Sequence, residues 1–478
     1  LLALGAAACS PDQVVGNAKL PPDIPDPTAV QTPGGAVSAY RGALAQFRRA
    51  FAANLTSPFV VVSGLLADEL QAEGIGYPVG VFSYGMRTDS RVLPEMEGDV
   101  QVNEPYESAY SELQLIRGQG SQARGLLTRF APDSLQALTG HLDALQGYAE
   151  IFLADLFCSG IPLSTVDYDG DFTLRPGSPT ADVYQHAITM FDSALALVAD
   201  SARILNLARV GKARALLALG RFAEAAQAVA EVPDDFQYAV YYVNQPDGRN
   251  FAYYAPGTAR PDIMADREGG NGLDYISSHD PRTAATIVAT STNGRPLYRP
   301  AKYALTGGTP VVVASGVEAR LIEAEAQLNG AVAGDWLTTL NTLRTNGTFT
   351  RVDTIVDHVD TTDVGGTPQV DTTYRYDTLW VAGTGGVAGL GPLHDPGTPD
   401  ARVDLVFRER AFWLFLTGHR QGDMRRLIRL YRRNPNLVYP VGAYPGGTGR
   451  YGGEVDAPVP SRERTYNSLF HGCLSRGA

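Results

Sequence analysis

The sequence has few cysteines and histidines, and it lacks any long hydrophobic run. Its 478 residues include three cysteines and seven histidines, without CxxC pairs and without the spacing of metal ligands. We therefore expect no metal site. No run of 18 apolar residues occurs, so the sequence predicts no complete transmembrane helix.

Signatures of catalysis and nucleotide binding are also absent. The chain has no HExxH, no GxSxG and no Walker loop. Residues 383–388 (GTGGVA) resemble part of a dinucleotide-binding fingerprint, but no helical pattern follows them. The acidic run 167–171 resembles the start of a calcium loop, yet Ser178 occupies the twelfth position, where a glutamate is required. We predict no catalytic residues and no cofactor.

Positive charge is scarce relative to negative charge. The chain has 39 Lys and Arg against 51 Asp and Glu, which gives a net charge of −12. A field of that sign opposes nucleic acid, so we expect no nucleic-acid partner. The hydrophobic content of 44% is ordinary for a globular protein, and the length allows a large core.

Helical periodicity dominates the first half of the chain. Apolar residues recur at helical spacing in the segments 37–53, 65–71, 106–116, 133–157 and 179–199. Residues 207–233 predict a helix–turn–helix, because Ala213 and Ala225 allow close approach and Gly220 makes the turn. This segment is similar to one tetratricopeptide unit, which needs neighbouring helix pairs to bury its apolar face. An unrelated alanine-rich hairpin is the alternative.

Two irregular regions interrupt the helices. Residues 234–305 are rich in Tyr, Gly, Pro and Asn, and residues 350–398 contain short β-like runs at 355–359 and 372–380. Loops of this length are usually functional or disordered, and the aromatic content of the first region argues against disorder. Helical patterns return at 316–329 and 335–344.

Charged residues lie inside a strongly apolar segment at 403–429. Its first half is apolar on nearly every side, which predicts a buried helix, yet it contains Glu409. Gly418 can adopt the left-handed conformation that turns the chain, and Arg420 and Asp423 follow it. Because buried charges are tolerated when paired, we predict that Glu409 and Arg420 form a buried structural pair with Asp423 nearby.

The composition of the first nine residues predicts a targeting signal. LLALGAAA reads as the tail of a signal-peptide hydrophobic region, and the small residues before Cys9 resemble a lipobox. We predict lipidation at Cys9 and a proline-rich tether over 10–35. An ordinary secretory cleavage site is the alternative. Export leaves two alternatives for Cys158 and Cys473, a disulfide or two buried free thiols.

The order Glu-Arg, apolar run, Thr-Gly-x-Arg, Asp and two arginines in 409–426 resembles the C-terminal helix pair of the SusD/RagB family. These are helical, lipid-anchored nutrient-binding proteins of the bacterial outer membrane. The lipobox, the helices near 65, 106, 148, 207, 320 and 340, and APVPSRERTYN at 457–467 extend the resemblance over most of the chain.

This resemblance implies a mainly α fold, in which tetratricopeptide-like helix pairs form a base with long irregular loop-rich insertions and little β. A single SusD/RagB-like domain is expected over 36–478. It comprises a helical base at 36–233, a loop-rich insert at 234–305 and a C-terminal helical and loop part at 306–478.

The resemblance also implies a non-enzymatic function at the cell surface. The expected protein is an outer-membrane lipoprotein that binds an oligomeric nutrient, a glycan, and passes it to a TonB-dependent (SusC-like) outer-membrane transporter. Two other functions stay open. A lipid-anchored surface hydrolase needs converging carboxylates or a nucleophile with its base, and none is visible. A tetratricopeptide-type envelope adaptor predicts helix pairs through the whole chain, which the long inserts disfavour.

Candidate ligand-binding residues are the tyrosines of the insert. Sugar rings stack on aromatic side chains, and sugar hydroxyls pair with Asn, Asp and Arg, all of which are abundant in 234–305. The first candidates are Tyr241, Tyr242, Tyr253 and Tyr254, and the regions 77–84 and 372–380 come next. The alternative is that these tyrosines anchor the long loops to the helical base.

Overall fold

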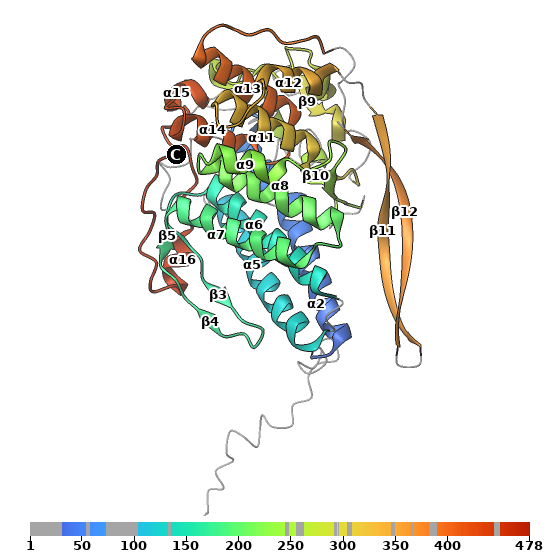
Figure 1. Ribbon diagram of the computed structural model, residues 1–478. Helices are drawn as coiled ribbons and strands as arrows, with labels where there is room; N and C mark the ends of the chain where they lie inside the picture. The colour runs from blue at the N-terminus through green and yellow to red at the C-terminus, as the bar shows by residue number, and fades with distance from the viewer. Residues whose placement is uncertain are drawn as a thin grey trace, which may run out of the picture.

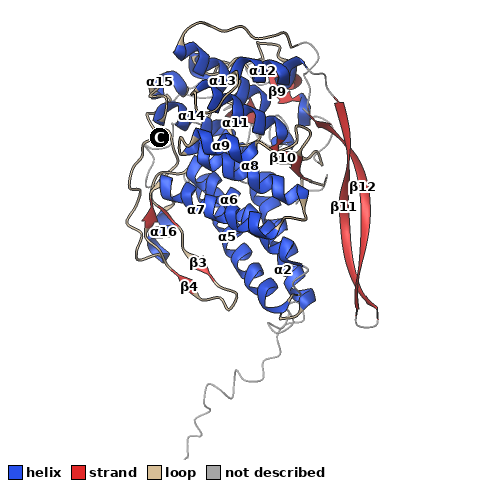
Figure 2. Ribbon diagram, in the orientation of Figure 1, coloured by secondary structure: helices blue, strands red, loops and turns tan. Residues whose placement is uncertain are grey.

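The computed structural model describes residues 31–53, 58–72, 104–131, 135–243, 248–254, 262–290, 294, 296–303, 308–345, 349–364, 367–381, 390–443 and 450–478. At 72, 104–105, 253–254, 262–263, 288–289, 349–364 and 367–381 the description covers the backbone alone. Helices dominate, and the short strands pair antiparallel in twos (Figures 1 and 2). This arrangement confirms the predicted mainly α fold with little β.

Packed helices form the N-terminal half of the molecule. In chain order they are α2 (Pro33–Arg48), the π-helix η2 (Arg49–Ala53), α3 (Phe59–Leu66), α5 (Glu104–Phe130), α6 (Gln136–Leu156), α7 (Thr180–Leu197), α8 (Ala202–Ala218) and α9 (Phe222–Val229). From α5 to α9, each helix packs against the next in sequence (Figure 1). The apolar residues that define the helical period line the largest core cluster.

The helix pair α8–α9 confirms the predicted helix–turn–helix. Ala213 and Ala225 are fully buried, and Gly220 makes the turn with a φ of +75°. Gly211 explains how α7 approaches α8 so closely. A Cβ added there would stand 2.3 Å from Cζ of Phe191, so only glycine accommodates the ring.

The predicted helix at 65–71 is wrong beyond its first two residues. Helix α3 ends at Leu66, and strand β1 (Leu70–Ala72) pairs with β7 (Asp262–Met264). The backbone of this segment bonds across to the insert instead of along a helix. The Glu69 side chain fixes the change of direction, because its Oε1 accepts a 2.7 Å hydrogen bond from the Leu416 amide.

Short elements and buried aromatics attach the insert to the base. Its elements are β6 (Gln237–Val240), α10 (Phe251–Tyr254), β7, η5 (Glu268–Gly270), η6 (Pro281–Thr283), β8 (Ala285–Thr290), β9 (Pro296–Pro300) and η7 (Ala301–Tyr303), and β6 pairs with β10 (Val311–Ser315). Tyr238, Phe251 and Tyr275 all lie in the main core. Anchoring is therefore the role of many aromatic residues in this region.

The C-terminal part contains more helices and one long hairpin. The helices are α11 (Gly316–Leu328), α12 (Trp336–Thr345), α13 (Pro399–Trp413), α14 (Arg420–Arg429), α15 (Pro435–Val438) and α16 (Ser461–Tyr466). Strands β11 (Phe349–Val364) and β12 (Thr367–Val381) form the hairpin. The two short β-like runs predicted at 355–359 and 372–380 are parts of these longer strands. Four two-residue strands, β2 (Ile161–Pro162), β3 (Thr165–Val166), β4 (Phe172–Thr173) and β5 (Gly177–Ser178), complete the structure.

The predicted pair between Glu409 and Arg420 is wrong, although both residues are buried. Arg420 donates to both oxygens of the Asp68 carboxylate, at 2.7 and 2.9 Å. Glu409 accepts from Arg282 at 2.6 Å and from Arg344 at 2.7 Å. Each charge thus pairs with the element that it faces, because Arg420 begins α14 against the α3–β1 junction while Glu409 lies on α13 beside η6 and α12.

Asp423 belongs to a second buried ionic cluster. Its carboxylate accepts from Arg410 at 2.9 Å and from Arg426 at 3.0 Å, and Arg426 also donates to Glu325 at 2.7 Å. Burial opposes the charge of Asp423, but the two arginines hold the pKa of its carboxyl well below the ordinary range. Gly418 adopts a φ of +76°, as predicted for the turn between the helices.

The end of α6 is bound to residues far along the chain. Cys158 and Cys473 form a disulfide with 5.9 Å between their Cα atoms, which decides between the two alternatives for these residues. The Cys158 amide donates to the Ala457 carbonyl at 2.8 Å. Arg425 donates to the carbonyls of Ala154 and Phe157 at 2.7 and 2.8 Å, so it satisfies acceptors that the helix end leaves open.

Candidate functional site

A polar cavity of about 410 Å³ lies where the insert meets the C-terminal loops. It is lined by the turn after β7, by residues 441–443 and by Gln71 of β1. Its lining residues are Gln71, Asp266, Arg267, Glu268, Gly269, Gly270, Val441, Gly442 and Ala443. Three segments that are distant in sequence therefore converge on one hollow.

Left-handed backbone conformations shape this cavity. Arg267, Gly269 and Gly270 have φ values of 49°, 61° and 85°. A Cβ added at Gly269 would stand 2.4 Å from the amide nitrogen of Val441, so glycine is required where the two loops touch. Asn271 holds the loops together, because its Nδ2 donates to the Tyr439 carbonyl at 2.6 Å.

Hydrogen bonds fix the acidic residues of the cavity wall. Asp266 Oδ1 accepts from the Ile276 amide at 2.9 Å, and Glu268 accepts from the Tyr451 hydroxyl at 2.6 Å. The amide of Gln71 differs from them. This side chain is only 4% exposed, and its Nε2 has no hydrogen-bond partner among the described residues. A buried donor without a partner is costly, so Gln71 is well placed to bind a ligand acceptor.

The lining groups can bind a hydroxyl-bearing ligand. An amide, carboxylates and the guanidinium of Arg267 are the groups that recognise hydroxyl-bearing ligands. Within the described ranges, no three His, Cys, Asp or Glu side chains are grouped as metal ligands would be. In the same ranges, every helix is too short or too polar to cross a membrane.

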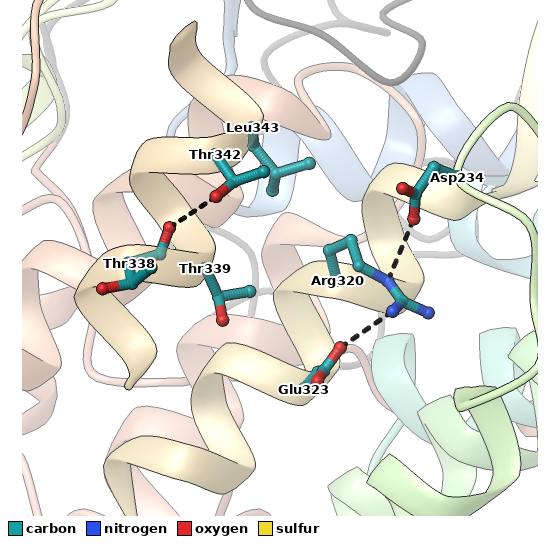
Figure 3. A pocket seen from close by; sticks show the side chains of 7 residues that line it. All are labelled: Asp234, Arg320, Glu323, Thr338, Thr339, Thr342 and Leu343. Atoms are coloured by element: carbon teal, nitrogen blue, oxygen red, sulfur yellow. Dashed lines mark hydrogen bonds and ion pairs between the residues drawn. The ribbon is translucent and has the colours of Figure 1, made fainter. Parts of the chain in front are cut away.

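A second, smaller groove of about 220 Å³ lies between α11 and α12 (Figure 3). Thr338, Thr339 and Thr342 line one side, and Arg320 faces them from the other helix. Arg320 pairs with Glu323 at 3.0 Å, and it also donates to the Val229 carbonyl at the end of α9. Its charge is thus engaged in holding helices together, which makes this groove the weaker candidate.

The structure separates the four predicted tyrosines from the larger cavity's lining. Tyr242 is 2% exposed, and its hydroxyl donates to the Arg48 carbonyl at 3.4 Å. A ring buried in the core cannot stack on a ligand, so the prediction for Tyr242 is wrong. Tyr241 is half-buried beside it. The side chains of Tyr253 and Tyr254, and the whole of Cys9, lie outside the described residues.

Sequence reasoning missed the turn at 266–270. The run DREGGNG at 266–272 signals a tight turn, because consecutive glycines permit positive φ. Nothing in the sequence shows that this turn meets residues 441–443, which follow more than 160 positions later.

Comparisons with known proteins place the fold. The sequence matches no family model and no curated protein. Solved structures do match over nearly the full length. A SusD-like carbohydrate-binding protein from Bacteroides vulgatus is 12% identical with a TM-score of 0.62, and the match covers 92% of this chain and 97% of that one.

Two further matches are surface glycan-binding proteins. Surface glycan-binding protein A from Bacteroides thetaiotaomicron is 11% identical with a TM-score of 0.59, covering 93% of this chain and 100% of its own. The protein of the same name from Bacteroides uniformis is 12% identical with a TM-score of 0.62, covering 92% and 99%. Identities this low bear on architecture alone, and on that ground this chain has the SusD-like fold.

Proposed function

We propose that this protein captures an oligomeric nutrient, a glycan, at the cell surface and does not transform it. The observation that carries the proposal is the SusD-like fold over more than nine-tenths of the chain, shared with structures described as carbohydrate-binding and surface glycan-binding. The cavity beside Gln71 is the proposed site. Its polar lining and its position between three separate segments of the chain suit a hydroxylated ligand.

Binding and release form the whole proposed mechanism. The Gln71 amide donates to a sugar hydroxyl, and the carboxylate of Asp266 accepts from another. Asp266 and Glu268 accept hydrogen bonds from the Ile276 amide and the Tyr451 hydroxyl, and the proposed mechanism gives them no catalytic role. The ligand then passes to a TonB-dependent outer-membrane transporter, which is the proposed partner.

A lipid at Cys9 is the proposed anchor, and the segment between it and Pro33, where α2 begins, is the proposed tether. Several acyl chains together hold a protein firmly on a membrane, because each buried CH₂ contributes about 0.8 kcal/mol. The mass of the N-terminal peptide, taken after expression of the complete gene in a bacterium with an outer membrane, tests this proposal. An unmodified Cys9 would contradict it.

Substitution at Gln71 tests the binding site. A panel of neutral oligosaccharides of four to eight sugars, screened by calorimetry, should contain at least one ligand for the parent. Gln71→Leu should then weaken binding at least tenfold, because the substitution removes the buried donor. Thr342→Val is the matched control in the smaller groove and should leave affinity within twofold. Equal affinities of the Gln71→Leu variant and the parent would move the site elsewhere, and product formation from the bound sugar would replace binding with catalysis.

A further inference from the structure

The β3–β4 hairpin and the C-terminal segment that contains α16 lie together on one side of the molecule (Figure 1). Nine large apolar residues are exposed in the part of the chain that the structure describes, and five of them belong to these two segments. Phe172 and Tyr466 are 74% and 80% exposed. Single exposed apolar residues are ordinary, but a group of them marks an interaction site. The group is here called the flank patch and consists of Phe172, Leu174, Tyr466, Leu469 and Leu474.

Direct links fix the two segments of the flank patch relative to each other. Asn467 Nδ2 donates to the Arg175 carbonyl at 2.8 Å, which joins the end of α16 to the chain that follows β4. The Leu474 amide donates to the Ser159 carbonyl at 2.7 Å, beside the disulfide that binds the same two stretches. The flank patch is therefore a fixed surface of the folded protein.

Charges of opposite sign lie at the two ends of the flank patch. Arg175 and Arg464 are exposed beside α16, and neither forms an ion pair within the described ranges. Asp169 and Asp171 are exposed in the turn between β3 and β4, which lies at the far end of the hairpin (Figure 1). One cation, Arg129, lies over the aromatic ring of this turn, against three carboxylates, so the turn stays acidic.

This arrangement discriminates between classes of partner. An anionic membrane attracts the arginines, but it repels the three carboxylates at the other end. An apolar centre with a charged rim is the usual anatomy of a protein–protein interface. A twofold axis brings the acidic end of one copy against the basic end of the other, so the patch is complementary to itself. A second copy of this chain therefore satisfies the apolar centre and both charged ends.

We propose that the flank patch is the interface of a twofold homodimer. The apolar residues of the two copies pack against each other around the axis. Arg175 and Arg464 of each copy pair with Asp169 and Asp171 of the other. The interface uses neither the cavity beside Gln71 nor any step of the proposed function, so the two proposals are tested separately.

Exposed apolar residues elsewhere on the surface provide a matched control for the packing. The test variant combines Phe172→Ser and Tyr466→Ser in the flank patch. The control variant combines Ile287→Ser and Leu437→Ser, whose parent side chains are 61% and 72% exposed and lie outside it. Sedimentation equilibrium of the full chain gives the dimer dissociation constant, and far-UV circular dichroism checks that each variant folds. The test variant should weaken the dimer at least tenfold, and the control should stay within twofold of the parent.

Charge reversal tests the pairing across the axis. Arg464→Glu and Asp171→Arg should each weaken the dimer at least tenfold, because like charges then face each other twice in the twofold interface. The variant with both changes should return to within threefold of the parent, since opposite charges face each other again. A parent that stays monomeric at every concentration would overturn the proposal, as would equal losses in the two serine variants or a double reversal as weak as the single ones. Binding of the parent to phosphatidylglycerol vesicles without dimers in solution would assign the patch to a membrane instead.

Discussion

Replacing Arg420 with alanine should destabilise the protein strongly, because it leaves the buried Asp68 carboxylate without its partner. Asp68 is fully buried and Arg420 is 6% exposed, so water cannot solvate either charge if its partner is removed. Burial of Arg420 opposes its charge, but Asp68 more than compensates and the pKa of the guanidinium lies above its ordinary value. Breaking a buried pair by removing one partner costs about 3–5 kcal/mol. Urea unfolding followed by circular dichroism should show a loss of this size.

Two further variants separate this cause from general damage. Arg402→Ala removes a pair with Asp395 whose side chains are 36% and 42% exposed, and an exposed pair contributes little to stability because water screens it. Asp68→Asn combined with Arg420→Met removes both charges and should recover at least about 2 kcal/mol relative to Arg420→Ala, since no charge is left stranded. If Arg420→Ala unfolded at the same urea concentration as Arg402→Ala, the reasoning would be refuted.

Further predictions concern the disulfide and pH. Replacing Cys473 with serine opens a loop closed over 315 residues and should cost about 2–5 kcal/mol in urea unfolding; an unchanged midpoint would speak against a stabilising bond. Burial raises the pKa of Glu69 to about 8 from 4.5, so its stabilising contribution is complete below pH 4.5 and declines by on the order of 5 kcal/mol as the pH rises from 4.5 through 8. Glu69→Gln should flatten that decline in a pH series of unfolding midpoints. A curve parallel to that of the parent would show that Glu69 does not cause the decline. Burial lowers the pKa of His141 to about 3 from 6.5, so its contribution is complete above pH 6.5 and is lost as the pH falls toward 3. His141→Gln should resist acid unfolding better than the parent between those values.

Local patterns predicted much of the fold. The helical period located most of the base, and the small residues of 207–233 predicted a close helix pair, because both signals act over a few residues. Gly418 was predictable for the same reason. The ionic partners were not, since Asp68 lies 352 positions before Arg420 and many cations compete for each buried carboxylate. Charge and burial indicated that pairs exist, whereas only the packing of α13 and α14 determines which ones.

The sites were harder to predict than the fold. Tyrosine content directed attention to Tyr242, but a tyrosine in a loop-rich segment can equally fill the core, as this one does. The cavity depends on a turn whose glycines meet a loop distant in sequence, so no local signal reveals it. The full length of the hairpin strands was hidden as well, because an inserted residue, Asp357, shifts the period-two pattern between Val356 and His358.

The contacts between the end of α6 and residues far along the chain determine when the helical base can finish folding during synthesis. The carbonyls at the end of α6 accept hydrogen bonds from Arg425, and the Cys158 amide donates to Ala457. The ribosome adds Ala457 about three hundred residues after Cys158. Contacts of such separation are slow to form and cannot form during synthesis of the first half. Until those residues are synthesised, the end of α6 lacks its partners and its carbonyls are exposed to water. A nonsense mutation between residues 234 and 425 would leave the whole helical base in the chain but remove Arg425, Ala457 and Cys473, which complete the end of α6.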